Sequence, residues 1–376
     1  MTPRIALVGA FPFPLSQGSQ RFLSDQARAL QAAGARVTVF TYGVGDGHAP
    51  DDIELRRTPR WTNPRRLSSG LAVRKPLADL ALTRLVLRSH RERAFDALLA
   101  HNAEAALAGF AARMRGGPPV VYVAHTLWQQ ELASHLPPGA LAPAWPRLGA
   151  ALDRFCARHS AAVLALTEAA RVALSPHARG PIVVVPPGWR PEAEPSIEAV
   201  QRACARKGLE PGRYVVYAGN LDRYQGLELL DAAAAAVPEL RCIAVTHARR
   251  PGRFRALETV HVASPQDARA LVFGAGCVAI PRRALGGFPL KLIDAMEARR
   301  AIVGHTGLLG SLLHDESAWC LPPGAGAAQW AASLAALQRD NALRQRLGAG
   351  ARTVLEGEHA WPKLADRTLQ LISSLR

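Results

Sequence analysis

The chain has 376 residues, of which 49% are hydrophobic and 20% are charged, and its formal net charge is +16. This length exceeds what one hydrophobic core usually holds, so two domains are predicted, and the composition excludes a disordered chain. No apolar run approaches the roughly 20 residues that span a bilayer. The run from Ile5 to Phe13 is interrupted by Gly and Pro and predicts a buried strand, not a signal peptide, so we expect a cytoplasmic protein.

The first half of the chain alternates short apolar runs with helical patterns. Strands are predicted at 4–11, 35–43, 95–102, 119–126 and 182–188. A helix is predicted at 19–34, ended by Gly34, and a strand followed by a helix at 161–174. Strand, helix and strand in close succession are typical of right-handed βαβ units in a parallel sheet.

The second half repeats this alternation. A strand is predicted at 213–221, an Ala-rich helix at 226–238 and further strands at 240–247, 271–282 and 301–307. The Pro-rich segment 186–195 is predicted to be the interdomain linker. We therefore predict an α/β protein with domains at 1–188 and 189–358, followed by a C-terminal helix at 359–376. In such sheets ligands bind beyond the carboxyl ends of the strands, where five polar residues stand: His101, His125, Asn220, His247 and Arg282.

Positive charge is concentrated between Arg56 and Arg93, a segment that contains eleven basic residues and only two acidic ones. Such a segment attracts anions. The helical pattern at 74–93 places Arg84, Arg88 and Arg91 on one face. Two interpretations stay open: a helix on an anionic membrane surface, or a peripheral helix whose arginines are solvated. Nucleic acid is disfavoured as a partner because no recognition signature accompanies the charge.

The five cysteines are scattered and odd in number, and none stands in a CxxC spacing. We expect them to be reduced and mostly buried, without disulfides or metal ligation.

Four segments, taken in order, resemble one known family. They are FPFPLSQGSQRFLSDQARALQAAGARVTVFT (11–41), VVYVAHTLW (120–128), YAGNLDRYQGLELLDAA (217–233) and GGFPLKLIDAMEARRAIVGHTG (286–307). Together with the terminal segment 359–376, they resemble glycosyltransferase family 4. The resemblance implies the GT-B fold: two Rossmann-like domains with parallel sheets face each other across a cleft, and the C-terminal helix returns to the N-terminal domain.

The resemblance implies an acceptor-binding domain at 1–188, with two groups of site residues. Gly18 and Ser19 begin a helix near the donor diphosphate, where backbone N–H groups and the helix dipole attract an anion. His125 follows a strand and is expected to face the reacting sugar.

The second domain, 189–358, is implied to bind the nucleotide sugar. The family's phosphate motif has a glycine followed by Arg and, five residues later, by Lys; here Gly219 is followed by Asn220 and Gln225, which are neutral hydrogen-bond donors. Gly286 stands where the first acid of a glutamate pair is usual, and Asp294, at the second position, is expected to receive the ribose hydroxyls. The loop between them adds donor-binding candidates: Gly287, Phe288, Pro289, Leu290 and Lys291. Four cations can replace the missing ones: Arg223, Arg282, Arg283 and Lys291.

The implied reaction is the transfer of a sugar, with retention of configuration, from a nucleoside-diphosphate sugar to a lipid-linked or cell-envelope glycan acceptor. Catalysis then consists of positioning and of stabilising charge on the leaving group. No DxD pair or metal-ligand cluster follows a strand, so we expect a metal-independent, hexosyltransferase-like enzyme. We expect no cofactor, because the nucleoside-diphosphate sugar is the donor substrate. We expect it in the cytoplasm, and the membrane interpretation of 74–93 would place it on the inner face of the cell membrane.

Two alternatives stay open. The first is a catalytically silent GT-B protein that binds a nucleotide sugar or a partner transferase, because Asn220, Gln225 and Gly286 have replaced charged family residues. The second is a GT-B sugar-nucleotide epimerase.

Overall fold

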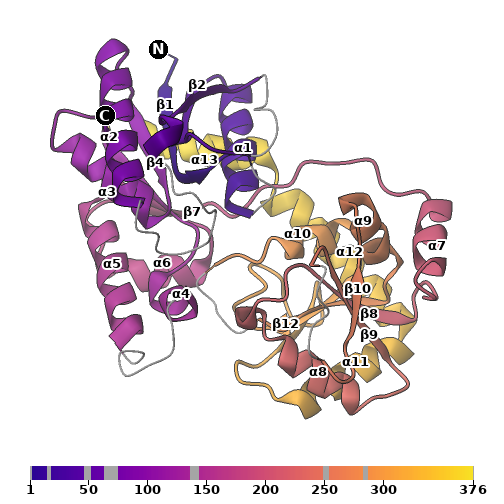
Figure 1. Cartoon of the computed structure of the whole chain (residues 1–376). Helices are drawn as coiled ribbons and strands as arrows, with labels where there is room; N and C mark the ends of the chain where they lie inside the picture. Colours follow the sequence, from indigo (N-terminus) through magenta and orange to yellow (C-terminus); the bar gives the residue numbers. More distant parts are fainter. Residues whose placement is uncertain are drawn as a thin grey trace. The chain divides into compact units, whose positions relative to one another are not determined.

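The computed structural model describes residues 2–14, 18–45, 52–62, 75–135, 144–248, 254–282 and 287–375, without the side chains of 131 and 133–135 (Figure 1). The chain forms two compact units. The first comprises Met1–Gly188, Gly286–Phe288 and Trp361–Arg376, and the second comprises Trp189–Leu285 and Pro289–Ala360. No helix in the described ranges is long and apolar enough to cross a membrane.

The first unit is built on a seven-stranded sheet in the order β3-β2-β1-β4-β5-β6-β7. Its strands are β1 (Arg4–Pro12), β2 (Arg36–Tyr42), β3 (Glu54–Arg57), β4 (Ala97–His101), β5 (Val120–Ala124), β6 (Ala162–Ala165) and β7 (Ile182–Val184). Neighbouring strands are parallel. Continuous apolar runs such as 5–8 are buried, as parallel strands covered on both faces require. The strand order reverses between β1 and β4, where ligands of such sheets usually bind.

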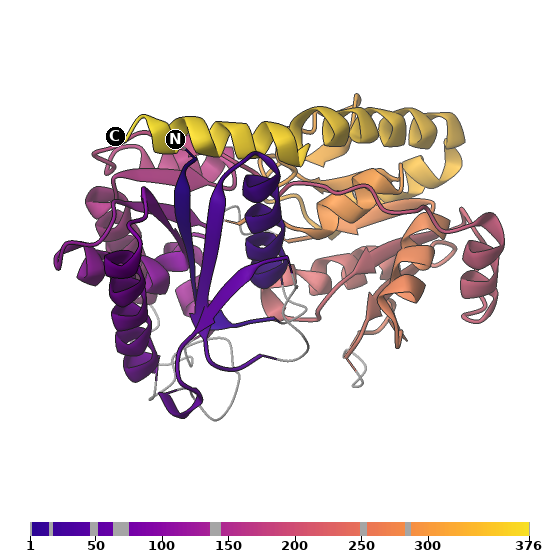
Figure 2. The ribbon, with the colours of Figure 1, turned by 90° about the horizontal axis from the view of Figure 1, so that it is seen from above.

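Helices cover both faces of this sheet. They are α1 (Gly18–Ala32), α2 (Lys75–Glu92), α3 (Asn102–Arg113), α4 (Trp128–His135), α5 (Trp145–His159), α6 (Glu168–Leu174) and α13 (Trp361–Ser373), with the short 3-10 helix η1 (Arg60–Thr62). α3 packs against both α2 and α5, and α13 packs against α1 (Figure 2). The terminal helix thus belongs to the first unit, because its apolar stripe, which begins at Trp361 and ends at Ile372, is buried there.

The second unit is built on a six-stranded sheet in the order β10-β9-β8-β11-β12-β13. The strands are β8 (Tyr214–Ala218), β9 (Arg241–Thr246), β10 (Glu258–His261), β11 (Cys277–Ile280), β12 (Ala301–His305) and β13 (Trp319–Leu321). The helices are α7 (Ile197–Ala205), α8 (Leu227–Ala235), α9 (Pro265–Gly274), α10 (Lys291–Glu297), α11 (Ala327–Arg339) and α12 (Asn341–Glu358), with η3 (Arg223–Gln225). Here the order reverses between β8 and β11.

One predicted strand is partly wrong. The run 271–282 was expected to be a strand, but only Cys277–Ile280 is β11, and 271–274 form the last turn of α9. Ser264 caps that helix, because its Oγ accepts from the Asp267 amide at 3.1 Å, and Pro265 occupies its first turn. A short apolar run cannot by itself distinguish the end of a buried helix from a strand.

The chain passes between the two units within the Pro-rich segment 186–195. Gly188 ends the first unit against Trp361, where a β-carbon would lie 2.3 Å from the indole ring, so only glycine fits. Trp189 begins the second unit; its indole Nε1 donates to Glu297 Oε1 at 3.0 Å, and the Arg352 guanidinium lies 4.5 Å from its ring centroid. All five cysteines are free thiols, and four of them are buried.

Candidate active site

Two histidines meet at the carboxyl edge of the first sheet. His101 ends β4 and His125 directly follows β5, its parallel neighbour, so the fold brings the two rings together. His101 Nδ1 lies 2.9 Å from His125 Nε2. The rings are 0% and 8% exposed. Burial lowers the pKa of both, that of His125 to about 3, so both imidazoles are neutral at physiological pH.

The helix α1 brings two further features to the same unit. Its first residues, Gly18 and Ser19, are exposed and partly exposed, and its first turn carries no acidic side chain that would repel an anion. One turn later, Phe22 packs against both histidines, with ring centroids 5.8 Å from His101 and 5.1 Å from His125.

In the second unit, Lys291 lies at the carboxyl ends of β8 and β11, where the strand order reverses. It is the first residue of α10, and its Nζ donates to Tyr217 Oη at 2.8 Å and to Gln225 Oε1 at 2.6 Å. The ammonium also lies 4.1 Å from the Tyr217 ring centroid. Gly219, with a φ of +151°, leaves room for it, because a β-carbon there would lie 3.3 Å from Lys291 Nζ.

The two neutral residues of the phosphate motif are hydrogen-bonded to each other, and Gln225 also contacts this lysine. Gln225 is 5% exposed, and its Nε2 donates to Asn220 Oδ1 at 2.8 Å. Asn220 Nδ2 in turn donates to Asp222 Oδ2 at 2.6 Å and to Tyr224 Oη at 3.2 Å. The amide at position 225 therefore holds a cation that comes from another element, instead of providing one itself.

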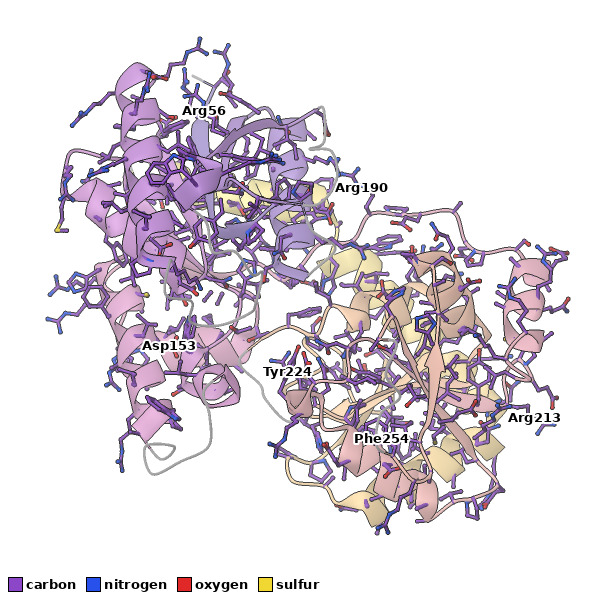
Figure 3. All side chains as sticks on the ribbon, viewed as in Figure 1. Arg56, Asp153, Arg190, Arg213, Tyr224 and Phe254 are labelled. Atoms are coloured by element: carbon purple, nitrogen blue, oxygen red, sulfur yellow. The ribbon has the colours of Figure 1, made fainter. Side chains whose placement is uncertain are left out.

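Arg282 adds a second cation next to this network. It follows β11, is buried, and its guanidinium lies 5.3 Å from the ring centroid of Tyr224, a residue labelled in Figure 3. Burial, and after it the charge of Arg282, lower the pKa of Lys291 to about 7, while Asp294 and Asp222 act in the opposite direction. Lys291 thus changes its charge close to neutral pH.

The turn directly after Gln225 is also fixed by close packing. Gly226, at a φ of +70°, lies so close to the end of β11 that a β-carbon there would be 2.6 Å from the Pro281 carbonyl oxygen. Arg223, in contrast, is exposed. Of the two arginines, the buried Arg282 is therefore the one whose charge acts on Lys291.

Comparisons with known proteins bear on this arrangement. The family model described as Glycosyltransferase Family 4 matches residues 16–193. A D-inositol 3-phosphate glycosyltransferase of Xylanimonas cellulosilytica is 27% identical over 405 residues, which cover 98% of this chain and 96% of that protein. Residues 16–193 therefore belong to glycosyltransferase family 4.

Solved structures show that the chain has the GT-B fold, as predicted. Sucrose-phosphate synthase from Thermosynechococcus elongatus matches with a TM-score of 0.79 and 18% identity, over 99% of both chains. Alr3699/HepE of Anabaena, in complex with UDP and glucose, matches with a TM-score of 0.73 and 16% identity, over 99% of this chain and 100% of that one. WaaG, a glycosyltransferase involved in lipopolysaccharide biosynthesis, matches with a TM-score of 0.69 and 15% identity, over 98% and 99% of the two chains.

The remaining predicted donor-binding residues lie along the start of α10. Gly287, Phe288 and Pro289 are buried, Leu290 is the N-cap residue, and Asp294 lies in the first turn, where it is partly exposed. Gly286 and Arg283 lie outside the described residues, so their roles stay predictions. Among the described residues, no group of three or more His, Cys, Asp or Glu side chains could hold a metal ion.

Sequence reasoning assigned no role to three residues of the network, Tyr217, Asp222 and Tyr224. All three lie inside the segment that resembles the phosphate motif, so their position was a usable signal. What the segment could not reveal is the contact of Tyr217 and Gln225 with Lys291, which is 74 and 66 residues away in the chain.

Proposed function

We propose that this glycosyltransferase moves a sugar, with retention of configuration and without a metal ion, from a nucleoside-diphosphate sugar to a lipid-linked or cell-envelope glycan acceptor. The observation that carries the proposal is the ammonium of Lys291, which Gln225 holds at 2.6 Å beside the motif position where a lysine is usual. Further support comes from the Anabaena relative, whose structure contains UDP and glucose, and from the relative involved in lipopolysaccharide biosynthesis.

In this proposal the second unit binds the nucleoside diphosphate. Lys291 and Arg282 neutralise the diphosphate, and most strongly as negative charge builds up on it while the bond to the sugar breaks. Asp294 accepts hydrogen bonds from the ribose hydroxyls; it lies one turn after Lys291 on α10, so a single short helix positions both groups. Gly219 leaves space for a phosphate oxygen beside the ammonium.

The first unit contributes neutral groups in this proposal. The first-turn N–H groups at Gly18 and Ser19 attract a donor phosphate, together with the N-terminal dipole of α1. His125, which burial keeps neutral, forms a hydrogen bond to the reacting sugar instead of presenting a charge. No side chain is required to form a covalent intermediate, since positioning and charge stabilisation supply the catalysis.

Donor binding is expected to weaken as the pH rises above about 7. In the free protein Lys291 is protonated below its pKa of about 7 and neutral above it, and only the protonated form neutralises the diphosphate. The donor Kd should therefore rise by up to roughly tenfold per pH unit between pH 7.5 and 9. Calorimetric titration with a nucleoside diphosphate over pH 6–9 measures this. In Lys291→Met the slope should vanish; a flat wild-type profile would contradict the assignment.

The exposed face of α2 carries the acceptor side of the proposal. Arg84, Arg88 and Arg91 line a surface hollow of about 470 Å³ together with Leu87 and Glu92. On the same helix Leu77 and Leu80 are exposed. Arginines beside exposed leucines fit anionic headgroups and the upper acyl region of a bilayer. We propose that the described part of the basic segment 56–93 places the enzyme on the inner face of the cell membrane, where a lipid-linked acceptor is found.

Removing the three α2 arginines is expected to release the protein from anionic vesicles. Each arginine near such a surface contributes about 1 kcal/mol, so Arg84→Gln, Arg88→Gln and Arg91→Gln together should weaken binding by on the order of a hundredfold. Sedimentation with phosphatidylglycerol vesicles measures this. The control carries the same charge change at three exposed arginines of the second unit, Arg202, Arg213 and Arg339. Equal losses of vesicle binding in both variants would show that the attraction is nonspecific, and would reject α2 as the membrane-binding surface.

A donor panel tests the function itself. The protein is incubated with UDP-, GDP- and ADP-sugars, with and without a membrane extract as the acceptor source. Release of nucleoside diphosphate with labelling of the extract supports the transferase. Binding of a sugar nucleotide without release of nucleoside diphosphate favours the catalytically silent protein, the alternative that the neutral Asn220 and Gln225 support. A converted sugar nucleotide without acceptor identifies an epimerase, and no binding of any donor rejects the proposal.

A further inference from the structure

The histidine pair leaves one polar atom without a partner. His101 Nε2 is buried and has no hydrogen-bond partner among the described residues. Its other nitrogen, Nδ1, lies 2.9 Å from His125 Nε2, so one of these two atoms must donate to the other. Because both rings are neutral, the direction of this hydrogen bond fixes the position of every ring proton in the pair.

Only two arrangements exist for two neutral rings. In the first, His101 Nδ1–H donates to His125 Nε2, and the unpartnered His101 Nε2 carries a lone pair and no proton. In the second, His125 Nε2–H donates to His101 Nδ1, and His101 must then carry its proton on Nε2, as a buried N–H without an acceptor. Buried N–H groups without a partner are rarer than acceptors without one, which favours the first arrangement.

We propose that His101 is a positioning residue, which donates from Nδ1–H to His125 Nε2 and thereby holds His125 with its own proton on Nδ1. His125 then presents an N–H donor at Nδ1, the ring nitrogen that does not contact His101. It offers this donor to a substrate oxygen and does not act as a base. This consequence for the substrate rests on the proposed function, whereas the proton positions do not.

The surrounding structure restrains both rings. Directly after His101, Asn102 adopts a left-handed φ of +72°, which non-glycine residues rarely do and which fixes where β4 ends and α3 begins. The Phe22 ring meets His125 edge to face, with an interplanar angle of 84°. Trp361 of α13 stacks on Phe22, with centroids 5.8 Å apart. Rotation of either imidazole would disturb this packing.

Ring-nitrogen NMR tests the proton positions in the whole protein, without substrate. The twelve histidines are labelled with ¹⁵N, long-range ¹H–¹⁵N correlations report the protonated nitrogen of each ring, and the signals that disappear in His125→Gln assign that residue. We expect His125 to be protonated on Nδ1 and unprotonated on Nε2. A proton on Nε2 of His125 would overturn the proposal.

Three variants separate positioning from packing. His101→Asn keeps an N–H near the position of Nδ1, so the Nδ1–H pattern of His125 should persist, with kcat/KM within about threefold of wild type. His101→Leu removes the donor, so the pattern should be lost and kcat/KM should fall about tenfold, the loss of one hydrogen bond. Phe22→Leu disturbs packing but leaves the hydrogen bond, so it should keep the Nδ1–H pattern.

Two outcomes contradict the assignment: an unchanged pattern in a folded His101→Leu protein, or a pattern that is lost equally in His101→Asn. Thermal unfolding confirms that each variant is folded. If the donor panel finds no transferase activity while the Nδ1–H pattern is present, the proposed function fails and the proton assignment stands.

Discussion

Lys291→Met is expected to lower kcat/KM for donor turnover by about 10²–10³-fold, the usual loss when a group that stabilises transition-state charge is removed. Methionine has nearly the length of lysine and is apolar, so it keeps the contact with the Tyr217 ring, which lies 4.1 Å from Nζ in the wild type. It removes the charge that Gln225 holds at 2.6 Å. Release of nucleoside diphosphate under initial-rate conditions measures the effect.

Two further variants make this prediction specific. Lys207→Met removes a partly exposed lysine of the same unit, whose Nζ donates to the His261 carbonyl, and should leave kcat/KM unchanged. Gln225→Lys in the Lys291→Met background returns a cation to the family's usual position and should recover part of the lost activity. If Lys291→Met stays within threefold of wild type, the diphosphate is neutralised elsewhere and the proposed role of Lys291 is wrong.

Trp361→Ala is expected to destabilise the first unit by roughly 3–5 kcal/mol, the cost of truncating a large buried aromatic side chain. Trp361 is 7% exposed, stacks on Phe22, and occupies the space that Gly188 leaves open. Its removal leaves a cavity between α13 and α1 at the point where the chain returns from the second unit. Urea denaturation monitored by circular dichroism should show the transition of the first unit shifted to lower denaturant.

A matched tryptophan on the surface provides the control. Trp61, in η1 of the same unit, is 71% exposed, and Trp61→Ala should change the free energy of unfolding by less than about 0.5 kcal/mol. If the two variants unfold alike, the packing of α13 against α1 does not stabilise the first unit and the assignment of Trp361 as its anchor is wrong.

Much of the candidate site could be predicted from the sequence because its residues lie at the ends of predictable strands. His125 directly after β5 and Gly219 directly after β8 follow apolar runs whose ends are visible in the pattern. Position 225 was identified as lacking its usual lysine. What the sequence could not predict was that Lys291 lies beside this residue, since nothing local in 217–233 indicates a partner 66 residues further along.

The same reasoning explains the partial error at 271–282 and the unassigned His101. Apolar runs of four or five residues fit a helix end and a strand equally well, and only the cap at Ser264 and packing decide between them. His101 was recognised as a residue at a strand end, but its partnership with His125 depends on β4 and β5 being neighbours in the sheet.

By itself the sequence determined the two α/β units, because periodicity and end signals are local properties of the chain. The family was indicated separately, by the resemblance of four motifs in their order. The tertiary structure decided which side chains of the site meet. Strand order brings β8 beside β11 and β4 beside β5, and these pairings unite Gln225 with Lys291 and His101 with His125. Such contacts follow from the packing of elements far apart in the chain, and no local pattern encodes them.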